Sequence, residues 1–180
     1  MHATALESTQ IHQTVVRLIK DDITALEVDA FVFYAQPDLV LGTGFGTAIS
    51  VRGGPTVQKE LEELAPVAAG DAVVSAAGNL KAQHIVHAVG PKFQEDDIEG
   101  KLRATVLNSL KRAEEKGIRR IAMPAMGAGY YGIPADLCAR VMLEAIASYL
   151  EGETGIKELI LCVLDTPQYN AFQAALTAIR

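Results

Sequence analysis

Short apolar runs, too brief for helices and rich in β-branched and aromatic residues, recur along the chain and predict six strands. They occupy residues 14–19, 30–34, 71–75, 84–89, 120–123 and 158–164. Segments with apolar residues at helical spacing predict helices over residues 56–64, 101–116, 134–150 and 166–179. Gly117 is a good stop for the second helix, and Pro134 suits the first turn of the third. Strands and helices therefore alternate through most of the chain.

Two of the predicted strands are apolar on both faces, at residues 30–34 and 159–164. Such runs are typical of inner strands in a sheet that helices cover on both sides. The pattern thus predicts an α/β fold with three layers. Residues 1–12 are small and polar without periodicity, so we expect a flexible arm there. Residues 13–180 are expected to form one domain, because a chain of this length can bury a single core of its own.

Composition narrows the class of protein. The chain carries 16 Lys and Arg against 22 Asp and Glu, a net charge of −6, and has no basic run. Binding to duplex nucleic acid requires a basic patch, so no sequence-specific nucleic-acid binding is expected. No apolar run approaches the ~20 residues of a membrane span, so no membrane association is expected either. Cys138 and Cys162 are unclustered and predict core thiols in a reducing cytoplasm.

Two glycine-rich loops each lie between the end of a predicted strand and a helical stretch. They are Gly42-Thr43-Gly44-Phe45-Gly46 and Gly127-Ala128-Gly129-Tyr130-Tyr131-Gly132. Ligands bind at such positions in open α/β sheets, because the backbone N–H groups of the loop and of a helix N-terminus can face an anion unobstructed. A pair of such loops predicts a diphosphate site. The alternative is that the glycines only serve tight turns.

Other motifs are weaker. The second loop matches G-x-G-x-x-G, but only one predicted strand follows it, so it does not indicate a Rossmann dinucleotide site. Neither loop is followed by Lys and Ser or Thr, which excludes a P-loop. His84 and His87 are three residues apart in a strand and face opposite sides, so they cannot share a metal ion. We therefore expect no metal site.

From about Val15 to its end, the chain resembles the macro domain family of ADP-ribose-binding modules. The similarity covers about nine tenths of the sequence, and its last two blocks are specific in combination. The resemblance implies a mixed, roughly six-stranded sheet between helices, with a ligand cleft at the strand ends and no cofactor. The similar blocks are Asp21–Thr24, Val28–Ala30, the first glycine loop with Ala48-Ile49, Arg52–Gly54, Gly78–Leu80, Ile85–Pro91 and Ile121–Pro134.

The resemblance also assigns roles to residues. Asp22 would accept a hydrogen bond from the adenine amine, with the Ile23 backbone nearby. The residues alone favour another role, because an Asp with a Thr two positions later is typical of a turn or a helix cap. The two glycine loops would wrap the diphosphate, and Tyr131 would flank the distal ribose. Leu164 stands where many members place a Phe or Tyr against adenine, so we expect weaker adenine binding.

Several positions depart from the family pattern. Where the family usually has Asn-Ala-Ala-Asn, this chain has Phe-Tyr-Ala-Gln, which makes Gln36 a weak catalytic candidate with a longer amide arm. Gly46 stands where an ester-hydrolysing branch has an Asp thought to act on water. A second hydrolytic branch has an Asp inside the second loop, where this chain has Tyr130 and Tyr131. The nearest acid, Asp136, fits the start of a helix.

Three functions follow from these observations. The favoured one is binding of ADP-ribose, or of an ADP-ribosylated molecule, without an efficient catalytic group. The second is slow hydrolysis of ADP-ribosyl esters or of acylated or phosphorylated ADP-ribose. The third is an interaction scaffold in which Phe45, Tyr34 and Tyr130 fill the cleft.

Overall fold

The computed structural model describes residues 7–42 and 44–179. Its strands are β1 (Ser8–Ile11), β2 (Thr14–Lys20), β3 (Ala30–Tyr34), β4 (Ala72–Ala76), β5 (His84–Ala88), β6 (Arg120–Met123) and β7 (Glu158–Val163). Its helices are α1 (Phe45–Gly53), α2 (Pro55–Leu64), α3 (Ile98–Glu115), α4 (Ala135–Leu150) and α5 (Thr166–Ala178), with 3-10 turns η1 (Ile23–Ala25) and η2 (Gly129–Tyr131).

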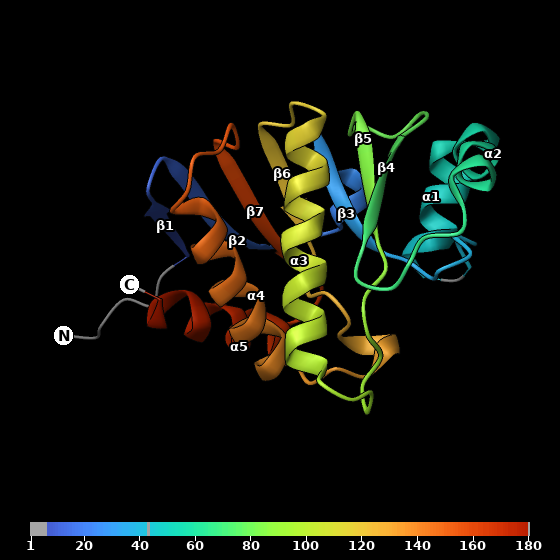
Figure 1. Cartoon of the computed structure of the whole chain (residues 1–180). Helices are drawn as coiled ribbons and strands as arrows, with labels where there is room; N and C mark the ends of the chain where they lie inside the picture. Colours follow the sequence, from blue (N-terminus) through green and yellow to red (C-terminus); the bar gives the residue numbers. More distant parts are fainter. Residues whose placement is uncertain (1–6, 43, 180) are drawn as a thin grey trace.

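The strands form one mixed sheet in the order β1-β2-β7-β6-β3-β5-β4. Neighbouring strands from β2 to β5 in this order are parallel, and only the outer pairs β1–β2 and β4–β5 are antiparallel. The C-terminal ends of five strands therefore meet at one edge of the sheet. Helices α3, α4 and α5 cover one face, and α1 and α2 lie on the other side (Figure 1). The predicted three-layer α/β fold is confirmed.

Two apolar cores lie on the two faces of the sheet. Val32 of β3 packs with residues of α3, α4 and α5, whereas the neighbouring Phe31 packs with residues of α1 and α2. This explains why β3 is apolar along its whole length. Cys138 and Cys162 are free and buried. No helix in the described part of the chain is both long and apolar enough to span a membrane.

The sheet has seven strands, one more than predicted. Residues 1–12 were expected to form a flexible arm, but Ser8–Ile11 form β1, which pairs with β2 in antiparallel register; residues 1–6 lie outside the described part. A turn connects the two strands, with His12 in the left-handed region at φ 54°. β1 has no apolar run because it is an edge strand with alternating exposed and half-buried residues. The backbone hydrogen bonds to β2, rather than a buried side-chain face, keep β1 in the sheet.

Helix α1 was not predicted. Its segment contains two glycines, Gly46 and Gly53, and lacks a clear apolar period. The helix begins at Phe45, so the end of the first predicted glycine loop is helical. Glycines weaken the propensity of a helix, and here tertiary packing of Ile49 at zero exposure compensates. The first loop is therefore shorter than its sequence suggests.

Candidate functional site

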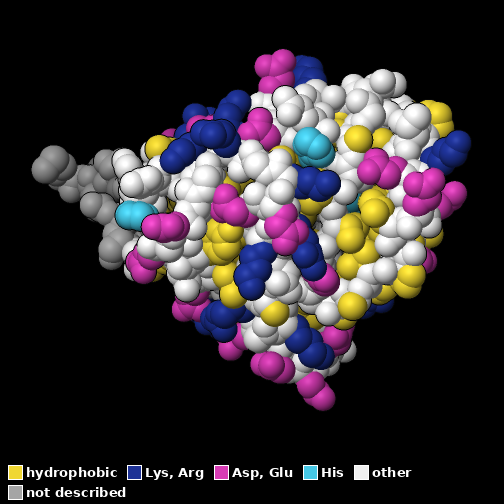
Figure 2. Space-filling view, turned by 45° about the horizontal axis from the view of Figure 1, so that its top comes forward, with side chains coloured by type: hydrophobic (Ala, Val, Ile, Leu, Met, Phe, Trp, Pro, Cys, Tyr) yellow, Lys and Arg dark blue, Asp and Glu magenta, His cyan; other side chains and the backbone are white. Residues whose placement is uncertain are grey.

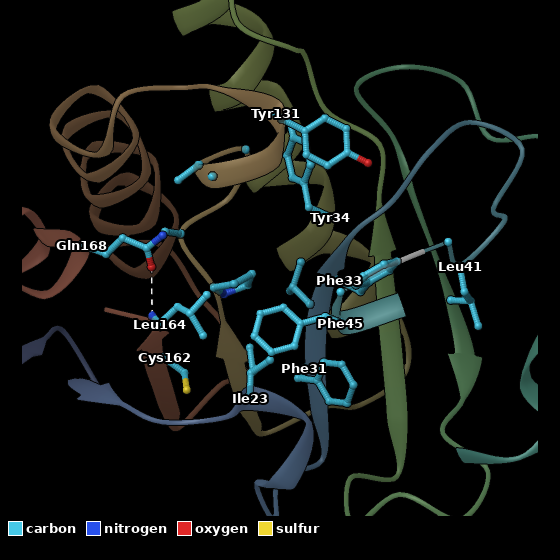
Figure 3. Close-up of a pocket in the computed structure, with 18 of the residues that line it drawn as sticks. Ile23, Phe31, Phe33, Tyr34, Leu41, Phe45, Tyr131, Cys162, Leu164 and Gln168 are labelled. Carbon is cyan, nitrogen blue, oxygen red and sulfur yellow. Dashed lines mark hydrogen bonds between the residues drawn. The ribbon is translucent and has the colours of Figure 1, made fainter. Parts of the chain in front are cut away.

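A cavity of about 510 Å³ lies at the edge where the C-terminal ends of β3, β6 and β7 meet (Figure 3). This volume is in the range of small-molecule binding sites. None of the described residues that line it carries a charge at neutral pH. They are Ile23, Phe31, Val32, Phe33, Tyr34, Gln36, Leu41, Gly42, Gly44, Phe45, Pro124, Ala125, Gly127, Ala128, Gly129, Tyr131, Cys162, Leu164 and Gln168.

The structure brings most of the predicted ligand-binding residues to this cavity. Thr43 lies outside the described residues, as does the side chain of Tyr130. Asp22, Gly46 and Gly132 do not line the cavity. The two glycine loops are far apart in the sequence yet face the same space. The predicted residues that line it are Ile23, Gln36, Gly42, Gly44, Phe45, Gly127, Ala128, Gly129, Tyr131 and Leu164.

The first loop leads directly into helix α1. Gly42 and Gly44 adopt positive φ values of 68° and 63°, which L side chains rarely adopt. Gly44 is the N-cap of α1 and supplies no side-chain hydrogen bond, so the first N–H groups of the helix have no side-chain cap. The Thr47 hydroxyl donates to the Gly42 carbonyl at 3.0 Å and ties the loop to the helix. A helix N-terminus of this kind favours an anion.

Gly46 lies in the first turn of α1 rather than in the loop, which corrects its predicted position. A Cβ placed on Gly46 would overlap the carbonyl group of Leu41. This clash is with backbone, so the position admits only glycine without a shift of the chain. Close packing of α1 on its own loop therefore leaves no room at position 46 for the carboxylate of the ester-hydrolysing pattern.

The second loop is held against the end of β3 by an aromatic pair. The rings of Tyr34 and Tyr131 make an edge contact, with centroids 4.8 Å apart. The Tyr34 hydroxyl donates to the Pro91 carbonyl, and burial raises the pKa of Tyr34. Gly127 has a φ of 82°, and a Cβ there would overlap the Ile133 side chain. The loop conformation thus depends on glycine and on Tyr34.

Asp22 sits beside the cavity as the N-cap of η1. Its Oδ1 accepts hydrogen bonds from the Thr24 backbone N–H at 2.9 Å and from the Thr24 hydroxyl at 2.6 Å. Its Oδ2 pairs with the Arg52 guanidinium at 3.0 Å. Burial acts to raise the pKa of Asp22, but the hydrogen bonds from Thr24 and Arg52 outweigh it and lower the pKa. The cap expected from the residues alone is present, and the contact with adenine stays a prediction.

Arg52 was not predicted to take part in the site. It extends from α1 to Asp22 and also donates to the Thr24 hydroxyl at 3.0 Å. No sequence signal links residues 22 and 52, because only the fold places α1 beside η1.

The described cavity wall offers little acid–base chemistry. Gln36 is exposed, and a Cβ on Gly42 would lie 3.7 Å from its Nε2, so the amide is next to the first loop. An amide side chain acts neither as an acid nor as a base near neutral pH. Burial raises the pKa of the Cys162 thiol to about 12, which keeps it protonated. Within the described residues, no group of three or more His, Cys, Asp or Glu could hold a metal ion.

Sequence reasoning missed nearly half of the cavity wall. Gln168 lies in the first turn of α5, and its Oε1 accepts a hydrogen bond from the Leu164 backbone N–H at 2.9 Å. The rule that ligands bind at strand ends identifies this position, since α5 begins just after β7. No sequence signal indicates that Phe31 and Val32 line the cavity, because both lie inside the buried strand β3.

Comparisons with known proteins place the chain in a family. The Macro domain model matches residues 34–142. An uncharacterized protein of Saccharolobus solfataricus is 37% identical over 168 residues, covering 91% of this chain and 93% of the relative. A macro domain-containing protein of Caldanaerobacter subterraneus is 37% identical over 169 residues, covering 89% and 94%. The chain belongs to the macro domain family.

Solved structures share the fold of this macro domain. An Oceanobacillus iheyensis macrodomain with ADP superposes with a TM-score of 0.90 at 22% identity, covering 96% of this chain and 95% of that one. A Trypanosoma brucei macrodomain in complex with ADP-ribose has a TM-score of 0.84 at 23% identity, covering 89% and 68%. The macro domain resemblance of the sequence is thereby confirmed for family and fold.

Proposed function

We propose that this macro domain binds ADP-ribose, free or attached to another molecule, in the cavity between its two glycine loops. The observation that carries the proposal is the convergence of both loops and the N-terminus of α1 on one cavity of about 510 Å³. The Oceanobacillus iheyensis and Trypanosoma brucei macrodomains, which share this fold, hold ADP and ADP-ribose respectively. Their ligands support the assignment of a nucleoside diphosphate sugar.

We propose that each part of the ligand is held as the family resemblance implies. The diphosphate is bound by backbone N–H groups of the second loop and of the first turn of α1, because oriented amides favour an anion. The adenine lies toward Ile23 and Leu164, at the end of the cavity near β7. The distal ribose lies toward Tyr131 and Gln36.

Binding of the diphosphate by backbone amides is compatible with the negative net charge of the protein. The net charge is −6, and basic and acidic side chains are interspersed on the face seen in Figure 2. A long polyanion requires many basic side chains, whereas one diphosphate can be held by amides alone. We therefore propose a ligand with one diphosphate rather than a nucleic-acid strand.

Binding without efficient hydrolysis is the activity we propose. The packing of Gly46 on Leu41 leaves no room for a carboxylate, and the described cavity wall contains no Asp, Glu or His. General acid–base catalysis needs such a group within hydrogen-bonding reach of the reacting atoms. The scaffold alternative expected aromatic rings to fill the cleft, but the cavity remains open although Tyr34 and Phe45 line it.

We also propose a cytoplasmic location. Both cysteines are free thiols and both are buried, which is compatible with a reducing compartment.

Calorimetric titration with ADP-ribose tests the proposal. We expect saturable binding at a single site in protein shown by circular dichroism to be folded. Gly129→Glu places a strained backbone and a carboxylate at the cavity and should abolish binding; Gly129 has a φ of 73° and open space around its Cβ position.

Gly117→Glu is the matched control, because Gly117 has a φ of 70° and equally open space but follows α3. It should bind like the wild type. Absence of heat at millimolar ligand, or equal binding by both variants, would overturn the proposed function.

A further inference from the structure

Phe45 stands at the entrance to α1 with its ring in the cavity. It is the first residue of the helix, is half-buried, and lines the cavity (Figure 3). Figure 3 shows the ring projecting from the α1 side into the space near Ile23. By contrast, Phe31 lines the floor from β3 and has no exposed surface. Phe45 packs in part against the core on the α1 side of the sheet, and the rest of its side chain is open to the cavity.

The opposite wall at this end of the cavity is aliphatic. Leu164 directly follows β7 and has 58% of its surface exposed, and Figure 3 shows Cys162 on the same side of the cavity. A planar base entering here meets an aliphatic surface on one side and an aromatic ring on the other. Bases stack on aromatic rings whatever their hydrogen-bonding pattern, since every base has a π face.

We propose that Phe45 is the residue that stacks on the adenine base, so that the base lies between the Phe45 ring and Leu164. The inference rests on the proposed function, because it assumes an adenine nucleotide in this cavity. It assigns to α1 the aromatic contact that the β7 end of the cavity lacks. Phe45 thereby becomes a determinant of specificity for ligands that carry a base.

The start of α1 is built to hold the ring in place. Gly46 packs directly against the Leu41 carbonyl group, and the Thr47 hydroxyl bonds to the Gly42 carbonyl at 3.0 Å. These two contacts fix the backbone on both sides of the loop–helix junction. A side chain whose backbone is fixed loses less conformational entropy when it binds a ligand. The backbone that carries the ring is thus held in place before the ligand binds.

A set of variants distinguishes the effect of the aromatic ring from the effect of the apolar volume of the side chain. Phe45→Leu keeps an apolar side chain and removes the π face, and we expect it to weaken ADP-ribose binding about ten-fold in calorimetry. Phe45→Tyr keeps the ring and should stay within about two-fold of the wild type. The absorbance decrease of the stacked adenine should be smaller in Phe45→Leu at saturating ligand.

Leu164→Phe provides the reciprocal test. Combined with Phe45→Leu, it moves the aromatic ring to the other wall and should recover most of the lost affinity. A general loss of folding cannot explain such a recovery. Inorganic pyrophosphate has no base, so the dissociation constant obtained for it from competition with ADP-ribose should be the same in the wild type and in Phe45→Leu.

Three results would overturn the inference while leaving the proposed function standing. These are wild-type or tighter binding by Phe45→Leu, equal weakening by Phe45→Tyr, and a parallel loss of pyrophosphate binding. Failure of the wild-type protein to bind ADP-ribose would overturn both.

Discussion

Asp22 and Arg52 form an ion pair at 3.0 Å that joins η1 to α1 beside the cavity. Both side chains are partly exposed, with 37% and 51% of their surface accessible, so the pair contributes little to stability. Its importance is that it occupies Asp22 Oδ2, while Thr24 occupies Oδ1. A ligand amine that approaches Asp22 Oδ2 therefore shares this oxygen with Arg52.

Arg52→Ala is expected to strengthen ADP-ribose binding about three-fold, because it frees Asp22 Oδ2 to accept a hydrogen bond from the adenine amine. Calorimetry measures the change. Arg103→Ala breaks a comparable exposed pair with Glu144 between α3 and α4 and should leave the affinity unaltered. Weaker binding by Arg52→Ala would indicate that Arg52 itself contacts the ligand.

Buried His87 makes stability depend on pH. The His87 side chain has no exposed surface, its Nε2 lies 2.8 Å from the Ser75 hydroxyl, and its Nδ1 has no hydrogen-bond partner. Burial lowers the pKa of His87 to about 3. The unfolded chain, in which a histidine has a pKa of about 6.5, then binds a proton that the folded protein does not.

The free energy of unfolding should therefore fall as pH drops below about 6.5, by about 2 kcal/mol between pH 7.5 and pH 5. The carboxylates with lowered pKa, such as Asp71, lose their contributions only at lower pH. Urea unfolding of the wild type and of His87→Gln at both pH values measures the effect. At pH 7.5, the difference in the free energy of unfolding between the two proteins gives the effect of His87→Gln on packing. An equal pH dependence in both proteins would refute the assignment to His87.

Gly46→Asp should fail to create a hydrolase. The new Cβ would overlap the Leu41 carbonyl, so we expect the free energy of unfolding to fall by more than about 2 kcal/mol, with no gain in hydrolysis of ADP-ribosyl esters. Gly152→Asp is the control, because Gly152 is exposed, has no positive φ, and an added Cβ would make only an ordinary contact with the Tyr149 carbonyl at 3.4 Å. Thermal unfolding and an ester-release assay would show whether Gly46→Asp is instead stable and active.

Added salt should weaken ADP-ribose binding only modestly. The described cavity wall carries no charged side chain, so few counterions are displaced on binding. We expect a loss of about three-fold or less between 0.05 and 0.5 M NaCl, measured by calorimetry. A loss of a hundred-fold would show that basic side chains hold the diphosphate.

The sequence predicts the layers of this fold because its signals are local. Apolar runs and helical periods identified six of the strands and four of the helices, and these elements lie within a few residues of their predicted bounds. β1 and α1 were missed because neither has a strong apolar pattern. β1 depends on the backbone ladder of β2, and α1 depends on close glycine packing that only the folded chain reveals.

The parts of the site that depend on backbone conformation could be predicted from the sequence. The glycines at 42, 44, 127 and 129 identified two loops that the structure places around one cavity. Contacts between distant side chains were not predictable, as the Arg52–Asp22 pair illustrates. The direction of the Phe45 ring was also beyond sequence reasoning, because it depends on where α1 begins.

Strand β1 has a practical consequence for anyone who shortens this chain. The hydrophobic pattern suggests a domain that starts near residue 13, but a protein cut there would lack the ladder partner of Thr14–Arg17. The unpaired N–H and C=O groups of β2 would then form an open sheet edge, which is a template for pairing with another molecule. The four residues of β1 thus act as edge protection, and their removal should promote self-association rather than simply trim an arm.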